Sequence, residues 1–408
     1  MARTHLFVAA QKAPFGEAVL GVRIAHELHA RGDRIVLLAR DALSVLAENS
    51  PFRFERLGEN VSGIGQIIAR AATEARADSV VLLDVASVYM LLKAQGTDAV
   101  FVRSLPAPVL GLDVWNLEET GLTWDLAGVS WQHSRHVADV TRRLVPVPFA
   151  RPGKSPGLYD ALPREAPVSA DERAEVRADF GVASTERLLF LTSARWQHPS
   201  MQAHESGRRL AARFPLLVSE LIGRLGTDVR VVHVGPEPYP MQALGNRYTW
   251  LAQRGPRRFA RVLASADLFL SFNFSATTIG AAIAAAVPVL LGVSSYAGRA
   301  DEIVAKLPGP VSPALAAWLQ ETAPIAPFRV WPLGLARFLA PLARDNAYTT
   351  AFRAAEVLEE VSFLESMRAL LFDEAARGEL RHQQATYRSD VAQLPKAADL
   401  VDLYLGDP

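Results

Sequence analysis

Short apolar runs that alternate with longer helical stretches are the feature that most limits how this chain can fold. Runs such as HLFVAA (5–10) and DSVVLLDV (78–85) are almost wholly hydrophobic, and stretches with helical spacing of apolar residues separate them. Strands without a polar face need cover on both sides, which they obtain in parallel sheets flanked by helices. The pattern predicts an α/β protein built from Rossmann-like, doubly wound parallel sheets.

The alternation occurs twice, on either side of a proline-rich segment. Prolines recur from 146 to 167, so regular structure is not expected there, and we place a linker at 151–169. An N-terminal domain over 1–150 is expected to contain strands at 5–10, 34–40, 78–85, 98–104, 107–113 and 126–131, with helices at 19–32, 64–77 and 86–95. A C-terminal domain over 170–345 is expected to contain strands at 187–193, 228–236, 267–272 and 287–293, with helices at 170–179, 202–225, 256–265 and 278–286.

Residues 346–408 predict a helical tail. One apolar face recurs there at helical spacing and must be buried somewhere, at Val357, Leu358, Val361, Leu364, Met367 and Leu371. We expect the tail to pack back on the first domain, with this face across the seam between the domains.

Composition excludes several classes of function. Lys+Arg and Asp+Glu both number 43 in 408 residues, so bulk charge favours neither nucleic acid nor an anionic membrane. Cysteine is absent, which excludes disulfides and thiolate chemistry. The longest apolar stretch, 279–293, is shorter than the roughly 18 to 20 residues of a membrane span, and the N-terminus lacks the apolar region of a signal peptide. A cytoplasmic protein with a small-molecule partner is therefore expected; its oligomeric state is left open.

A small polar turn precedes the predicted helix 278–286. Ser275, Ala276, Thr277 and Thr278 are small enough for a diphosphate to reach the free N–H groups at the helix start, and three of them add hydroxyl donors. Ligands of open α/β sheets collect at this end of the strands. The alternative is that the serine and threonines only cap the helix.

The segment FARVLASADLFLSFNFSATTIGAAIAAAVPVLLG (259–292) resembles the donor-binding segment of GT-B glycosyltransferases. The resemblance implies that the diphosphate of a nucleotide-sugar is held at Asn273, Ser275, Ala276, Thr277 and Thr278. Two positions depart from the family pattern. Gly280 stands where many members have an acid that holds the ribose, and Ala286 replaces the glycine before the Val-Pro pair.

The stretch GEAVLGVRIAHELHARGDRIVLLA (16–39) is similar to the opening of glycosyltransferase family 1, with Glu17 in the column of the catalytic histidine. In DSVVLLDVASVYMLLKAQGTDAVFV, Asp84 occupies the column of the acid that orients that histidine. The resemblance implies that Glu17 is a general base paired with Asp84, and mutual repulsion would raise one pKa if they approach each other. The alternative is that Glu17 is only an acid favoured by a helix dipole.

Further residues complete the hypothesis. Ser193 and Trp196 follow the first strand of the second domain, where they can contact the donor or cover an interdomain edge. The family resemblance implies that Gly235 approaches the phosphates and Trp250 the base. Asp113 and Trp115 suit an acceptor pocket, or are surface residues.

Motifs for other cofactors are incomplete. GIGQII (63–68) has only part of the dinucleotide fingerprint, and the histidine pairs in 26–29 and 133–136 lack further metal ligands. No cofactor or metal is expected beyond a nucleotide-sugar as co-substrate. The expected function is an inverting, metal-independent hexosyltransferase that acts on a small molecule such as a natural product. The alternatives are a nucleotide-sugar epimerase and a non-catalytic binding or scaffold protein of the same fold.

Overall fold

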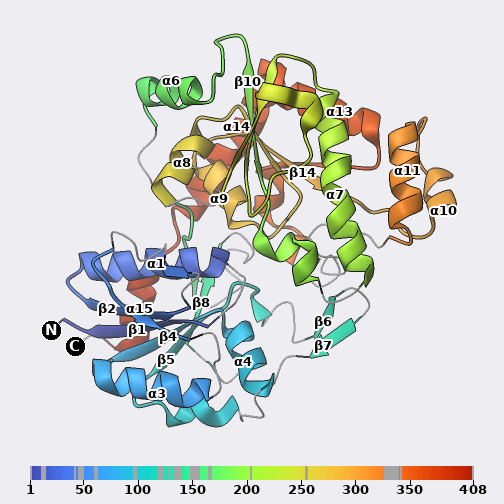
Figure 1. Ribbon diagram of the computed structural model, residues 1–408. Helices are drawn as coiled ribbons and strands as arrows, with labels where there is room; N and C mark the ends of the chain where they lie inside the picture. Colours follow the sequence, from blue (N-terminus) through green and yellow to red (C-terminus); the bar gives the residue numbers. More distant parts are fainter. Residues whose placement is uncertain are drawn as a thin grey trace.

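The computed structural model contains two α/β domains, one above the other in Figure 1. It describes residues 2–10, 15–40, 43–44, 50–58, 63–94, 99–117, 123–126, 129–132, 140, 142–147, 157–163, 168–202, 205–252, 256–325, 340 and 342–406. Among these residues, no helix has the length and apolar character to cross a membrane.

The first domain is built on a parallel sheet with strand order β3-β2-β1-β4-β5-β8-β9. Its strands are β1 (Thr4–Ala9), β2 (Arg34–Ala39), β3 (Arg53–Arg56), β4 (Ser79–Leu83), β5 (Val109–Leu112), β8 (Arg143–Pro146) and β9 (Leu158–Tyr159). Every residue of β1 and β4 is buried, as the apolar runs predict. Helices α1 (Phe15–Ala30) and α3 (Ile64–Ala75) lie on opposite faces, and α4 (Val85–Ala94) follows β4 (Figure 1).

Three expectations for this domain need correction. The run at 98–104 was expected to be a strand, but residues Ala99–Ser104 form a 3-10 helix. The segment 126–131 does not complete the sheet, because it divides between β6 (Thr123–Leu126) and β7 (Val129–Gln132), which pair with each other in a separate antiparallel hairpin. Strands β8 and β9 complete the sheet instead, and β9 lies within the segment interpreted as linker. Short apolar runs do not by themselves specify their pairing partner.

The second domain has a parallel sheet with strand order β12-β11-β10-β13-β14-β15. Its strands are β10 (Arg187–Thr192), β11 (Val229–Val234), β12 (Tyr248–Leu251), β13 (Leu268–Ser271), β14 (Val289–Val293) and β15 (Arg353–Glu356). Its helices before the tail are α6 (Ala170–Asp179), α7 (Glu205–Gly223), α8 (Pro256–Ala264), α9 (Thr277–Ala284), α10 (Ala300–Val304) and α11 (Pro313–Thr322). Strand β15 comes from the segment predicted to be helical tail.

The two faces of the second sheet pack differently. On β10, Leu189 and Leu191 face a core that helices α7, α11 and α13 (Glu360–Phe372) complete. Phe190, between them, faces the opposite core, which is continuous with the core of the first domain. This alternation is the two-residue period of a strand, and it joins one face of the second sheet to the domain below it.

Helix α13 does not lie across the interdomain seam. Its buried apolar residues are in the core of the second domain, where the helix packs on β14 and β15. Val357 and Leu358 are buried but precede the helix, and Val361 is 53% exposed. The predicted continuous face is therefore corrected: a strand and a turn precede the helix, so the helical spacing does not extend through them.

The last two helices connect the domains. From α14 (Glu374–Val391), Arg388 Nη1 donates to the Ile283 carbonyl near the end of α9, at 2.7 Å. Helix α15 (Ala397–Leu405) lies on the first domain, where the Ala398 N–H donates to Glu27 of α1 and the Tyr404 hydroxyl donates to the Arg143 carbonyl. The tail thus contacts the C-terminal halves of both α1 and α9.

Candidate functional site

The N-termini of α1 and α9 meet between the domains. A Cβ built on Gly16 would lie 3.0 Å from Thr277 Cγ2 and 3.2 Å from Thr277 Oγ1, so only a glycine lets the two helices approach this closely without displacement. Each helix follows a strand of its sheet, β1 or β13. Both helix starts therefore lie at the carboxyl ends of their sheets, the edge where α/β proteins bind ligands.

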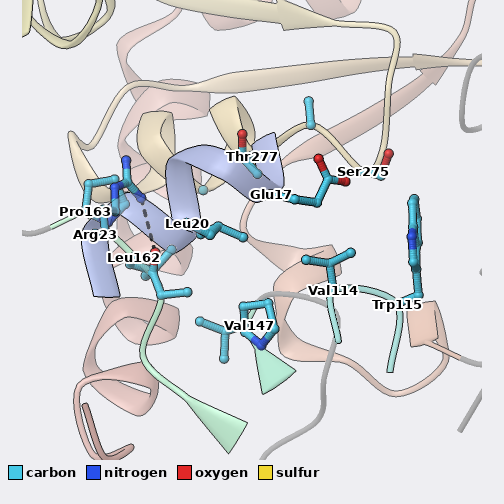
Figure 2. Close-up of a pocket in the computed structure, with 14 residues that line it drawn as sticks. Glu17, Leu20, Arg23, Val114, Trp115, Val147, Leu162, Pro163, Ser275 and Thr277 are labelled. Atoms are coloured by element: carbon cyan, nitrogen blue, oxygen red, sulfur yellow. Dashed lines mark hydrogen bonds between the residues drawn. The ribbon is translucent and has the colours of Figure 1, made fainter. Parts of the chain in front are cut away.

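A pocket with an empty volume of about 530 Å³, open mouth included, lies beside this contact (Figure 2). Both domains and the segment between them line it: Glu17, Leu20, Arg23, Val114, Trp115, Pro146, Val147, Ala161, Leu162, Pro163, Ser275, Ala276, Thr277 and Gly280. Figure 2 shows Glu17 extending from α1 on the side of Ser275, with Trp115 beyond and Val114 and Val147 below. Most of the wall is apolar; Glu17, Ser275 and Thr277 lie at one end of the pocket, and Arg23 lies beside Leu162 and Pro163 at the other.

Glu17 has an unusual electrostatic environment. Burial and, to a smaller extent, the charge of Asp84 raise the pKa of this carboxyl to about 8, because together they exceed the opposing effect of its backbone hydrogen bond. Asp84 is 3% exposed, follows β4 and has a φ of 69°. The two predicted catalytic carboxyl groups therefore lie close enough to interact, although Asp84 does not line the pocket.

The start of α9 has no side-chain cap. Ala276 is its N-cap residue and accepts no hydrogen bond through its side chain, while Ser275 donates its N–H and its hydroxyl to Asn273 Oδ1 at 3.0 and 2.8 Å. The capping alternative therefore does not describe this helix start. Thr277 lines the pocket, and Thr278 is the next residue of the helix, so both belong to this uncapped first turn.

Two departures from the family pattern have local physical reasons. A Cβ on Gly280 would lie 3.3 Å from Leu162 Cδ2, so an acidic side chain there requires the leucine to move. Ala286 has a φ of 55°, the left-handed conformation that favours glycine. The alanine keeps the backbone conformation that a glycine adopts readily, while Leu162 occupies the space beside the position of the ribose-binding acid.

Ser193, Gly235 and Trp250 lie at the ends of neighbouring strands in the second domain, around His233. Ser193 Oγ is 2.8 Å from His233 Nε2, and Trp250 Nε1 donates to the Gly235 carbonyl at 3.1 Å. Trp250 is 37% exposed. Trp196 is partly buried and contacts the cores on both faces of the second sheet. None of these four predicted residues lines the pocket of Figure 2.

The two predicted acceptor residues have different environments. Trp115 lines the pocket, but Asp113 is 2% exposed and accepts hydrogen bonds from the Leu117 N–H and from Arg143. Burial raises the pKa of Asp113, and these hydrogen bonds oppose the rise. Its carboxylate thus organises the turn behind Trp115.

Several lining residues escaped the sequence analysis. Arg23 donates to the Ala161 carbonyl at 3.3 Å, and Leu162 and Val147 contribute apolar wall. Their positions in an ordinary helix and beside prolines carry no signal for a site. Among the described residues no group of three or more histidine, aspartate or glutamate side chains is arranged to hold a metal, and residues 133–136 lie outside that set.

Comparison with known proteins gives a family and a fold. A family model described as "Family of unknown function (DUF6365)" matches residues 24–405. No curated protein sequence matches the chain. Solved structures that match include the glycosyltransferase SnogD from Streptomyces nogalater, at 16% identity, 100% coverage of both chains and a TM-score of 0.54.

Two further solved structures match over nearly the full length. The glycosyltransferase VinC, in complex with DTDP, shares 14% identity over 98% of this chain and 99% of its own, with a TM-score of 0.53. The spinosyn forosaminyltransferase SpnP shares 14% identity over 99% of this chain and 98% of its own, with a TM-score of 0.55. At these identities the likeness establishes the fold, which is GT-B.

Proposed function

We propose that this chain, which belongs to the family of unknown function DUF6365, is a glycosyltransferase of the hexosyltransferase type. It moves a sugar from a nucleoside-diphosphate sugar to a hydroxyl group of a small molecule. The donor binds mainly to the second domain, and the acceptor binds mainly to the first. The fold similarity to glycosyltransferases, one of them in complex with DTDP, supports this assignment.

The observation that carries the proposal is the meeting of Glu17 with the uncapped start of α9 in one cleft. Transfer needs a group that takes a proton from the acceptor and a group that stabilises the departing diphosphate. Glu17 suits the first role, because a carboxyl with a pKa of about 8 is a stronger base than an ordinary carboxylate. The N–H groups at the helix start and the hydroxyls of Thr277 and Thr278 suit the second.

The proposed reaction is a single displacement. The acceptor oxygen forms a bond to the anomeric carbon while its proton passes to Glu17, and the bond from that carbon to the diphosphate oxygen breaks. Attack opposite to the leaving group inverts the configuration at the sugar carbon. The helix dipole and the hydroxyl groups of Thr277 and Thr278 stabilise the charge on the diphosphate, so the proposed reaction needs no metal ion.

The acceptor side of the pocket supports a small, largely apolar substrate. Trp115, Val114 and Val147 form one wall, and Leu162 with Pro163 forms another. An apolar body bound there places one hydroxyl at the polar end, beside Glu17. These apolar walls favour a largely apolar natural product over a highly charged acceptor.

A panel of nucleoside-diphosphate sugars tests the proposal, with and without EDTA and with aromatic and aliphatic alcohols as acceptors. Chromatography and mass spectrometry identify the products. Sugar transfer or slow donor hydrolysis, unchanged by EDTA, supports a metal-independent glycosyltransferase. Epimerised donor supports an epimerase instead, and failure to bind any donor or nucleoside diphosphate in calorimetry supports a non-catalytic protein.

A further inference from the structure

A group of polar side chains in the second domain lies outside the cleft chemistry described above. His233 is fully buried in β11, with its ring between Ser193, at the end of β10, and Tyr248, at the start of β12. Ser193 Oγ lies 2.8 Å from Nε2, and the Tyr248 hydroxyl lies 2.9 Å from Nδ1. Burial lowers the pKa of His233 to about 3, so the ring is neutral at ordinary pH and carries one proton.

The backbone gives this group of hydrogen bonds a direction. The Tyr239 N–H donates to the Tyr248 hydroxyl oxygen at 2.8 Å, and a backbone N–H can act only as a donor. With that acceptor position of the Tyr248 oxygen taken, we assign the Tyr248 proton to His233 Nδ1, an arrangement that leaves the ring proton on Nε2, facing Ser193. Ser193 accepts that proton's hydrogen bond, so its own hydroxyl proton must point elsewhere.

We propose, on the basis of the proposed function, that His233 and Tyr248 are positioning residues that turn the Ser193 hydroxyl into a donor to the diphosphate of the nucleotide-sugar. Without ligand, the neighbouring Tyr239 hydroxyl interacts with Ser193 and takes this hydrogen bond. With ligand, the more strongly accepting phosphate oxygen replaces it. We call the hydrogen bonds from Tyr248 through His233 to Ser193 the relay. The relay transfers no proton and only fixes the orientation of the Ser193 hydroxyl.

The position of Ser193 supports this assignment. Strand β10 pairs with β13 in register through Leu191 and Leu270, so Ser193 ends its strand beside the loop that leads to the start of α9. Gly235 keeps the relay open, because a Cβ there would contact Ser193 Oγ and would lie 2.8 Å from His233 Nε2. The half-buried Ser193 is the relay member nearest to the proposed diphosphate position.

Binding measurements on Tyr248→Phe and Ser193→Ala test the relay. Calorimetry with UDP, TDP and GDP, and with the corresponding nucleosides, separates phosphate contacts from base contacts. Without the tyrosine hydroxyl, His233 can carry its proton on Nδ1 and accept from Ser193, which withdraws the serine proton from the ligand. Each variant is expected to lose about tenfold in diphosphate affinity and nothing in nucleoside affinity, and the double variant is expected to lose no more than either alone.

The control is Tyr296→Phe, which removes a tyrosine hydroxyl bonded to Glu359 at 2.7 Å, outside the relay. Unchanged diphosphate affinity in Tyr248→Phe, or additive losses in the double variant, would overturn the relay while leaving the proposed function intact. A wild-type protein that binds no nucleoside diphosphate would instead contradict the proposed function. ¹⁵N-histidine NMR gives an independent check, because the relay requires the Nε2–H tautomer at His233 and an Nδ1–H tautomer rejects it.

Discussion

The N-termini of helices α1 and α9 meet in this protein, and they differ in the residues placed at the positive end of each helix dipole. Helix α1 has an acid, Glu17, in its first turn, whereas α9 has neither an acid there nor a capping side chain. A first-turn carboxylate interacts favourably with the dipole of its own helix. Helix α9 instead has no side-chain cap among the residues that the structure describes.

The comparison shows that two neighbouring helix starts can differ in charge, with an acid at one and only small, uncharged residues at the other. At α1 the dipole favours the charged form of Glu17, yet burial and the charge of Asp84 have the larger effect and raise its pKa. At α9 the small residues 275–278 leave room for an incoming charge. The tail contacts both helices, α1 through Ala398 and α9 through Arg388.

The largest expected effect comes from removing the tail, which contacts both of the compared helices, α1 and α9. Deleting residues 346–408 removes β15, α13, α14 and α15, and with them the buried residues Met367 and Leu371. The remaining core is expected to expose apolar surface and aggregate. Size-exclusion chromatography checks this, with a chain shortened only by residues 407–408 as the control. A soluble and fully active truncation would show that the tail is a separate appendage.

The second prediction removes the base from the α1 side. Glu17→Gln keeps the shape of the side chain but cannot take a proton, so turnover is expected to fall by about 100- to 10,000-fold while donor affinity stays the same. Steady-state kinetics and calorimetry measure the two quantities. Glu74→Gln, on an exposed part of α3, is the matched control. If the Glu17→Gln variant is as active as the wild type, Glu17 is only an acid at a helix start, and Asp84 becomes the next candidate for the base.

The third prediction concerns the hydroxyl groups at the start of α9, which are the proposed hydrogen-bond donors to the diphosphate. Thr277→Val combined with Thr278→Val deletes two hydroxyls and retains β-branched shape, so the fold is expected to survive. Each lost hydrogen bond to a charged diphosphate is expected to cost about 1.5 to 3 kcal/mol of binding free energy. Calorimetry with UDP, TDP and GDP checks this, and Thr73→Val on α3 serves as the control. Unchanged affinity for all three ligands would refute the diphosphate assignment.

The smallest expected effect concerns the raised pKa of Glu17 and the part that the charge of Asp84 plays in it. Glu17 acts as a base only when ionised, so kcat/KM is expected to rise with pH and level off above about pH 8. Asp84→Asn removes one of the two causes of the raised pKa, and asparagine tolerates the positive φ at this position. The rising part of the pH profile is then expected to move to lower pH. An unchanged pH profile of kcat/KM in this variant would show that Asp84 does not act on Glu17 electrostatically.

Local signals in the sequence predicted much of the fold. The helix expected at 170–179 is α6, and Ser169 with Glu172 forms a capping box at its start. The apolar runs at 187–193 and 267–272 contain β10 and β13. The run at 98–104 failed because a short apolar segment is compatible with more than one conformation, and β15 was missed because RAAE carries no strand pattern.

For the site, the family resemblance together with the residues predicted that Glu17 and the turn 275–277 contribute, and both line the cleft. Asp113 and Trp115 were both expected to suit an acceptor pocket, but only Trp115 lines it, because the buried Asp113 carboxylate accepts hydrogen bonds from the Leu117 N–H and Arg143. His233 and Leu162 were not singled out. Their roles depend on neighbours that are distant in sequence, such as Tyr248 and Gly280.

The sequence by itself determined the fold class, the repetition of the α/β pattern and the small residues at the start of α9, because strand burial, helical spacing and side-chain size are local properties. Only the tertiary structure decided that α1 and α9 meet, that Asp84 acts on Glu17, and which helix of the tail returns to the first domain. Those relations join residues far apart along the chain, and their energies depend on distance and burial. Both quantities exist only once the sheets have paired and the domains have packed together.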